Sequence, residues 1–281
     1  MKKALIWIAA SLMMLGMTLF TVVLFMVNFD FTKLNNMKYT TNTYEFSEEP
    51  FGHIDINTIT SDIEFRKSDD GNCRVVCYES QKLRHEVTIQ DNTLTISEKD
   101  TRTWTDHITV FNFNSPSITI YLPLDTYEKL NIDNTTGDIH LSGNWNFSEI
   151  KLATTTGDVY VNGIATTGDV SVHVSTGKIK LENITCKNLT TDGSTGDTTI
   201  TDVFAESMRM KRTTGDITLE SCDAGTLYLR ATTGDITATL KTDKTVIASA
   251  TTGDVNVPHN TTGGRCEVST TTGDIHIRIK N

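Results

Sequence analysis

The chain has 281 residues and a formal net charge of −10, with 35 acidic against 25 basic side chains. Lysine and arginine do not cluster outside the N-terminus, so the composition argues against binding to nucleic acid or to an anionic lipid surface. The length suits one elongated domain with an anchor, and the five cysteines imply no disulfide framework.

Residues 1–28 predict a short cytoplasmic N-terminus followed by a transmembrane helix. Lys2 and Lys3 precede an uncharged, mainly apolar run from Ala4 to Val27. At ~1.5 Å per residue, this run is longer than the ~30 Å apolar core of a bilayer. A cleaved signal peptide is the alternative, but it would have a shorter apolar segment and a cleavage site with small residues, and neither is present here. We expect an uncleaved single-pass anchor, with everything after Asn28 outside the cytoplasm.

Residues 29–45 are expected to form a linker, and residues 46–130 a β region without repeats. Apolar residues alternate with polar ones in five stretches, at Ile54/Ile56, Ile63/Phe65, Val87/Ile89, Leu94/Ile96 and Ile118/Ile120/Leu122. Asp70-Gly71 and Asp91-Asn92 supply hairpin turns between them. We expect an antiparallel region that caps the following domain, because the ends of a stack of repeats need a cover.

Residues 131–281 carry a repeated tetrad, Thr-Thr-Gly-Asp, with a constant spacing. Its glycines are Gly137, Gly157, Gly177, Gly196, Gly215, Gly234, Gly253 and Gly273. They are separated by 20, 20, 19, 19, 19, 19 and 20 residues. A fixed period in this range is typical of a solenoid of stacked repeats.

Each repeat predicts two short strands joined by two turns. Positions two and four after each glycine are apolar almost throughout, and positions three and five are mostly polar, so one face of the strand is buried. A second alternating stretch follows about half a repeat later. One repeat cannot cover these apolar faces, so successive coils must stack in parallel, ~4.8 Å apart. The sequence therefore predicts an all-β fold with a parallel β-solenoid of 19–20-residue coils.

Stacking in sequence order would place Ile217, Ile236 and Val255 on top of one another. The last coil would then leave an open strand edge at Ile277 and Ile279, available to a partner. Arg278 and Lys280 would only blunt that edge.

The residues of the tetrad are those that form a tight turn. Glycine adopts the positive φ of a tight corner without steric cost, and aspartate accepts hydrogen bonds from nearby backbone N–H groups. An alternative is a weak ladder for a divalent cation, of which Asp197, Asp216, Asp235 and Asp254 would be the central members. Calcium prefers six to eight oxygens, and we expect turn capping with at most weak divalent binding.

The chain resembles the DUF4097 family of β-strand-repeat adhesin domains over residues 43–279. The resemblance rests on these segments: Ile118-Thr-Ile-Tyr-Leu-Pro123, Tyr127-Glu-Lys-Leu-Asn-Ile132, Thr135-Thr-Gly-Asp-Ile139, Ile59-Thr-Ser-Asp-Ile63 and the hairpin with Leu94-Thr-Ile96. It implies a β-solenoid with a membrane anchor in the envelope of a Gram-positive bacterium, in some relatives beside envelope-stress signalling systems. It supplies no catalytic residues. Lys178 departs from the pattern, because it replaces the aspartate of its tetrad.

The sequence indicates a binding or scaffolding role more than catalysis. A polysaccharide-cleaving enzyme needs a local cluster of carboxylates in different environments, whereas these tetrads offer identical ones. Cys73 and Cys77 have a spacing that suggests metal binding, but they fall on a predicted strand with no partner, so we expect neither a metal site nor a cofactor. Expected partners are the membrane, through the N-terminal helix, and an envelope glycan or protein on the outward face of the strands. The oligomeric state is left open, as is the choice between an adhesin and a stress sensor.

Overall fold

The computed structural model describes residues 2–26, 28–29, 38–47, 50–103, 115–259 and 262–280. Helix α1 spans Lys2–Met26. Its segment Ile6–Met26 has a mean hydropathy of 2.2 and is long and apolar enough to cross a membrane. The N-terminal apolar helix is a membrane anchor or a secretion signal, since both have this length and composition. Val27, the expected last residue of the span, lies outside the described residues.

In the described residues, 19 strands follow and belong to one continuous sheet. The strands before the repeats are β1 (Tyr39–Phe46), β2 (His53–Thr60), β3 (Asp62–Lys67), β4 (Cys73–Ser80), β5 (Leu83–Gln90), β6 (Thr93–Asp100), β7 (Ser117–Leu122) and β8 (Thr126–Thr136). The strands of the repeats are β9 (Ile139–Thr156), β10 (Val159–Thr166), β11 (Asp169–Thr176), β12 (Ile179–Thr195), β13 (Thr198–Thr214), β14 (Ile217–Thr233), β15 (Ile236–Leu240), β16 (Lys244–Thr252), β17 (Val255–Asn256), β18 (Gly264–Thr272) and β19 (Ile275–Ile279).

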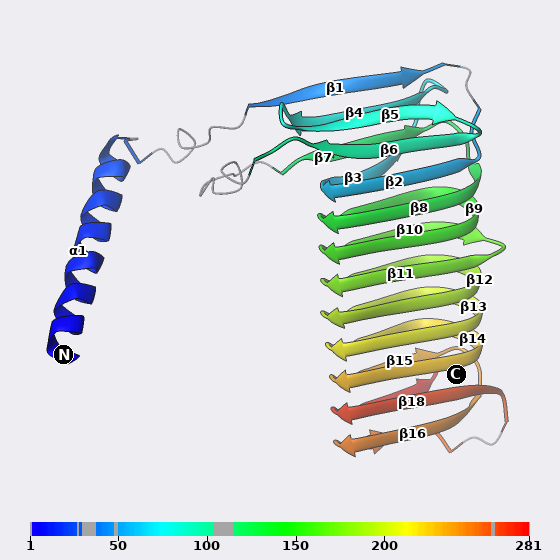
Figure 1. Ribbon diagram of the computed structural model, residues 1–281. Helices are drawn as coiled ribbons and strands as arrows, with labels where there is room; N and C mark the ends of the chain where they lie inside the picture. The colour runs from blue at the N-terminus through cyan, green and yellow to red at the C-terminus, as the bar shows by residue number, and fades with distance from the viewer. Residues whose placement is uncertain are drawn as a thin grey trace.

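The repeats form a β-solenoid, which confirms the fold class predicted from the period (Figure 1). Each coil contributes to two walls. The first wall contains the strand that follows a tetrad, and the second wall contains the strand that leads to the next tetrad. Successive coils pair in parallel and in register, for example Ile179 with Thr198 on the first wall and Leu189 with Met208 on the second. The glycine period keeps equivalent positions stacked, because 19 or 20 residues complete one coil.

The core is a single apolar column between the two walls. Alternation sends every second side chain inward, as at Ile179 and Leu181, which are 1% and 0% exposed. Aliphatic residues dominate the column, and all five cysteines are buried. Each fully buried aliphatic side chain contributes about 1.5–3 kcal/mol, so the stack is held together mainly by stacking of equivalent apolar positions.

The N-terminal β region joins the solenoid directly. Strands β2 and β3 form a first coil, which pairs in parallel with β8 and β9. Antiparallel pairs cover this coil: β5 with β6, β4 with β7, and β1 with β4 at the far end. Strand β1 lies partly in the stretch expected to be a linker, and residues 30–37 of that stretch lie outside the described residues. The cap buries Leu94, Ile96 and Ile118 on the same column as the repeats.

The last coils do not stack in sequence order, which corrects the expectation that Ile236 and Val255 are neighbours. On the first wall Ile236 pairs with Ile275, and Ile275 pairs in turn with Val255. On the second wall β18 lies between β14 and β16. In Figure 1 the red strand β18 accordingly lies inside the orange strand β16, which ends the stack. Val255 is 44% exposed, whereas Ile217 and Ile236 are 0% exposed.

A break in the strand accompanies this exchange. Strands β12 to β14 run without interruption from the first wall to the second, but β15 ends at Leu240 and β16 begins at Lys244. The three intervening residues let the chain pass over one layer. Lys244 is buried after this crossing, and its Nζ contacts the Asp223 carboxylate at 2.6 Å.

The open end of the solenoid is consequently formed by β16 on the second wall. On the first wall it is formed by the two-residue strand β17 and by the rest of β19, because among the described strands β17 covers only Ile275 and His276, so that Ile277 and Ile279 stay at the edge. Arg278 lies on this uncovered part of β19, as expected, whereas the edge of β16 is formed by other residues. The terminal edge at Thr245–Thr252 has no charged residue, and its Ile247 is 54% exposed. Edges of this kind pair readily with another strand.

Candidate functional site

The tetrad glycines line one corner of the solenoid, where the backbones of adjacent coils touch. All eight have φ between 117° and 145°. A Cβ added at any of them would lie 2.0–2.3 Å from a carbonyl oxygen of the adjacent coil. The N–H groups of all of them except Gly253 donate to a threonine carbonyl of the adjacent coil, as Gly215 does to Thr233 at 2.9 Å. Glycine is therefore required at this corner for both its φ and its lack of a side chain.

The tetrad aspartates form a ladder along the same corner. Oδ1 of Asp216 accepts the backbone N–H of Asp235 at 2.8 Å, and Oδ1 of Asp235 accepts that of Asp274 at 2.8 Å. Oδ1 of Asp197 accepts in the same way from Asp216, whereas the backbone N–H of Asp254 donates to Oδ1 of Asp274, because of the exchanged coil order. One oxygen of each accepting carboxylate is thus used by the backbone. Weak divalent binding by Asp197, Asp216, Asp235 and Asp254 stays a proposal, with fewer oxygens left than calcium prefers.

The outward face of the first wall carries an organised group, the Tyr160 patch, made of His140, Tyr160, Asn162, Lys180 and Glu182. The Tyr160 hydroxyl donates to Glu182 at 2.8 Å and accepts from Asn162 at 3.0 Å. Lys180 contacts Glu182 at 2.9 Å, and its Nζ lies 5.3 Å from the centre of the Tyr160 ring. The His140 ring lies 6.1 Å from the Tyr160 ring.

Electrostatics follow from these contacts. The hydrogen bond to Glu182 raises the pKa of Tyr160, so its hydroxyl stays protonated at neutral pH. The hydrogen bonds from Lys180 and Tyr160 lower the pKa of Glu182. The patch therefore presents a fixed aromatic ring between one cation and one anion on an accessible wall. Its members occupy the third and fifth positions after the glycine, where the sequence predicts a binding face, but the sequence does not single out this coil.

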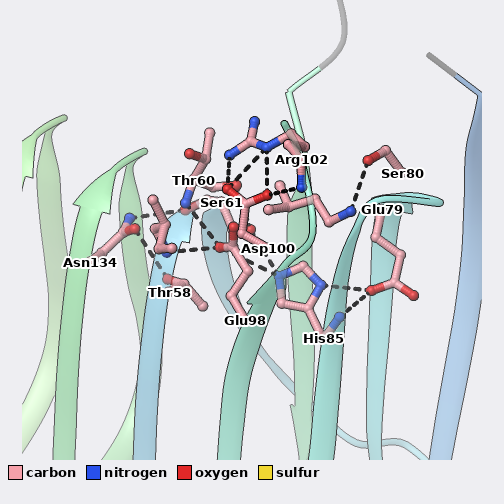
Figure 2. Close-up of polar contacts among 12 residues, drawn as sticks. Thr58, Thr60, Ser61, Glu79, Ser80, His85, Glu98, Asp100, Arg102 and Asn134 are labelled. Carbon is pink, nitrogen blue, oxygen red and sulfur yellow. Dashed lines mark hydrogen bonds and ion pairs between the residues drawn. The ribbon is translucent and has the colours of Figure 1, made fainter. Parts of the chain in front are cut away.

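A second polar group, the cap cluster, is buried where the β region meets the first coil. It consists of Ser61, Glu79, His85 and Glu98 (Figure 2). The His85 side chain is 0% exposed, and its Nδ1 lies 2.8 Å from Oε2 of Glu79. Its Nε2 lies 3.0 Å from the Ser61 hydroxyl and 4.0 Å from Oε2 of Glu98. Four elements supply these residues: Ser61 follows β2, and the others lie on β4, β5 and β6.

The cap cluster has the order of contacts of a Ser-His-Glu triad, but not its accessibility. Ser61 is 1% exposed and its hydroxyl also contacts the carbonyl of Thr60 at 2.7 Å. No substrate can approach a hydroxyl in this position without unfolding of the cap, so the geometry supports a structural role for the contacts of Ser61. Nucleophilic catalysis needs a reacting atom within reach of substrate.

The structural role is to end the corner ladder. Ser61 stands where later coils have a tetrad glycine, because Thr60 pairs with Thr136. No further tetrad is stacked above it, so a side chain is tolerated there. In place of a preceding coil, Oε2 of Glu98 accepts the N–H groups of Ile59 and Thr60 at 2.8 and 2.9 Å. The cap cluster thus satisfies backbone donors that an additional coil would otherwise bind.

The cap cluster was not predicted from the sequence, although the alternation contains a signal. Glu79, His85 and Glu98 each stand two residues after an inward apolar position, namely Cys77, Leu83 and Ile96. Ionisable side chains at inward positions of three strands predict a buried polar cluster, since unpaired buried charges are costly.

Comparison with known proteins identifies the fold and the family. The crystal structure of a "putative adhesin" from Bacteroides fragilis matches with a TM-score of 0.55 and 20% sequence identity, covering 85% of this chain and 97% of that one. A "putative adhesin" from Parabacteroides distasonis matches with a TM-score of 0.49 and 12% identity, over 86% and 98% of the two chains. No protein of curated function matches. The family model described as Toastrack DUF4097 matches residues 51–281, and the chain therefore belongs to this family.

Proposed function

We propose that this protein is a non-catalytic, membrane-anchored scaffold of the cell envelope, whose solenoid binds an envelope glycan or protein outside the cytoplasm. The helix α1 supplies the anchor, with the N-terminus in the cytoplasm. The family supports this assignment, since its structural neighbours carry adhesin descriptions. An adhesin and an envelope-stress sensor share these properties.

The Tyr160 patch is the observation that carries the proposal. An aromatic ring held by two hydrogen bonds loses little freedom on binding and offers an apolar face, while Lys180, Glu182 and His140 offer polar contacts around it. Tyrosine flanked by polar groups is typical of binding surfaces for this reason. Elsewhere on the same row the later coils carry Thr199, Thr218 and Thr237, followed by His276 and Asn256, and none of these provides a second tyrosine ring.

Catalysis is disfavoured by the placement of the reactive groups. The hydroxyl, imidazole and carboxylates of the cap cluster are buried, and the tetrad aspartates lie in a uniform exposed row. Hydrolysis of a polysaccharide by paired carboxylates requires environments that separate their pKa values. The repeated corner offers each aspartate nearly the same surroundings.

Capture of partners from native envelope tests the proposal. The full chain, purified in detergent, is immobilised and incubated with solubilised envelope from the native strain. We expect Tyr160→Ala combined with Lys180→Ala to reduce the captured glycan or protein about tenfold, corresponding to about 1.4 kcal/mol. The matched control is Thr218→Ala combined with Thr237→Ala on the same row, which should retain capture. Equal capture by both variants would contradict the role of the patch.

Genetics separates the two cellular roles. A deletion strain that attaches poorly to surfaces but responds normally to envelope stress supports the adhesin. The reverse result supports the sensor. Normal attachment together with a normal stress response would refute both roles.

A further inference from the structure

We propose that Cys77, Glu79 and His85 form a buried site for one transition-metal dication, for which zinc is the best match. One donor atom from each of these three buried residues lies within 4.8 Å of the other two. Cys77 and Glu79 are both on β4 and point to the same side, because they are two residues apart on a strand. His85 joins them from β5, the next strand of the hairpin. Thiolate, imidazole and carboxylate together are zinc ligands, and harder cations such as magnesium rarely use a thiolate.

The charges of the cap cluster support a bound cation. Glu79 and Glu98 are both carboxylates with side chains 1% and 0% exposed, and the ion pairs of each in the described structure are with the same imidazole. Hydrogen bonds from neutral groups reach both carboxylates: Glu98 accepts the N–H groups of Ile59 and Thr60, and Glu79 accepts the Asn42 amide and the N–H of His85. Two carboxylates with one imidazole nevertheless keep a net negative charge, even if the imidazole is protonated. Arg102 interacts electrostatically with Glu98, but its guanidinium forms its ion pair with Asp100, at 2.7 Å, and that carboxylate balances its charge. Burial of an uncompensated charge costs several kcal/mol, and a divalent cation removes that cost.

The surroundings of the second ring nitrogen of His85 also fit a metal at the first. Oε1 of Glu98 is buried without a hydrogen-bond partner, while Oε2 faces Nε2 of His85 at 4.0 Å. With a metal at Nδ1, the ring would carry its proton on Nε2, which faces the Ser61 hydroxyl and the Glu98 carboxylate. Metal-binding histidines usually donate their second N–H to a group of this kind, and this hydrogen bond fixes the orientation of the ring. Ser61 and Glu98 thus occupy the positions of supporting residues.

Binding would release one proton from the Cys77 thiol, because zinc binds the thiolate. The metal takes the sulfur electron pair, and the proton leaves to water. Burial and the charge of Glu79 raise the pKa of the free Cys77 thiol to about 12, so the metal-free thiol is protonated at neutral pH. The site is closed to solvent, and we expect the metal to enter during folding and to exchange slowly afterwards.

Cobalt substitution tests the site. The full chain, without a histidine tag, is unfolded in chelator, refolded in detergent with Co²⁺ and washed. We expect one cobalt per chain and a thiolate-to-cobalt charge-transfer absorption in the near ultraviolet, together with one zinc per chain in material refolded with Zn²⁺. Cys77→Ser should lose the absorption, and Ser61→Ala should weaken metal binding about 10- to 100-fold.

Cys73→Ser is the matched control, because Cys73 lies on the same strand and is equally buried but is not part of the donor group. This variant should keep both metal and absorption. If Cys77→Ser fails to fold, the charge-transfer absorption of the cobalt-loaded wild-type protein still tests the proposal, because it reports a metal–thiolate bond directly. Wild-type protein that refolds without metal and without this absorption would overturn the proposal, as would equal loss in the Cys73→Ser variant.

Discussion

Replacing Gly215 by alanine should destabilise the solenoid far more than the loss of a glycine usually does. Gly215 has φ 129°, and its added Cβ would lie 2.2 Å from the carbonyl oxygen of Gly196 and 2.6 Å from its carbonyl carbon. Real Cβ contacts are never so short, so the backbones of two coils must move apart. The hydrogen bond from Gly215 to Thr233 lies on the other side of the same peptide and would be disturbed by that movement.

The magnitude has two parts. A residue with a side chain in this region of φ costs about 1–3 kcal/mol. Forcing backbone shifts in a packed structure costs about 1–3 kcal/mol more. The central expectation is a loss of about 4 kcal/mol in the free energy of unfolding. In a domain of this size, 1 kcal/mol lowers Tm by about 2–4 °C, so the expected decrease is roughly 8–16 °C.

Gly71→Ala is the matched control. Gly71 also has a positive φ, 77°, but nothing lies within 4 Å of its added Cβ. Only the conformational cost of about 1–2 kcal/mol applies there. The assay is thermal unfolding of both full-length variants in the same detergent, followed by the β-sheet signal in circular dichroism. The reasoning is refuted if the two variants lower Tm equally, because contact between coils would then contribute nothing.

Four further results are expected. Tyr228→Cys with Glu267→Cys should form a disulfide on oxidation, because the two residues are paired on neighbouring strands. Tyr228→Cys with Ile247→Cys should not, since residues two strands apart are about 9.6 Å from each other and the Cα atoms of a disulfide need about 4.4–6.8 Å. Non-reducing electrophoresis would show the reverse result if the coils stacked in sequence order. Asp216→Ala should lower the free energy of unfolding by about 1 kcal/mol, because the hydrogen bond from the N–H of Asp235 is lost. Asp216→Asn keeps an acceptor oxygen and should lower it less. Equal losses of the two variants in denaturant titrations would contradict this. The five thiols of the folded protein should resist maleimide at pH 8, because burial raises their pKa to about 12 at Cys73, Cys77 and Cys186 and to about 11 at Cys222 and Cys266. Mass spectrometry should find all five labelled only after unfolding. Rapid labelling of the folded protein would disprove burial. Calorimetry should detect calcium binding no tighter than about 10⁻⁴–10⁻³ M, and absence of heat with an unchanged Tm would end the proposal of a divalent ladder.

The fold could be predicted because its determinants are local and repeated. The glycine period fixes the length of a coil, and alternation fixes which side chains point inward. Ile139 and Leu141 were expected on the buried face, and both are 0% exposed. Each coil repeats the same information, so an error in one unit would not have changed the architecture.

The order of the last coils could not be predicted in the same way. Every tetrad offers its neighbours the same N–H groups, carbonyls and aspartate oxygens, so Gly273 fits beside Gly234 as well as Gly253 does. Local patterns therefore carry little information about which copy is adjacent. The exchange coincides with the strand break between Leu240 and Lys244. The break alone does not predict it, because β10 and β11 are also separate strands and their coil stacks in order.

The cap cluster was missed because its members are distant in sequence and each has an unremarkable local context. Ser61, His85 and Glu98 come together only through the pairing of β2 with β6 and of β5 with β6. The Tyr160 patch was partly foreseen, since its face was predicted. Its organisation depends on which side chains meet across neighbouring coils, for example Tyr160 with Glu182.

The exchanged coil order also has a consequence for biosynthesis. A ribosome delivers residues 244–256 before residues 264–279, yet the earlier segment occupies the outer layer and the later one the layer beneath it. The nascent chain therefore cannot complete this end of the solenoid by adding one coil after another in sequence order. Residues 244–256 can take their final position only after residues 264–279 have paired with the layer beneath, so we expect the last coils to fold together in one cooperative step.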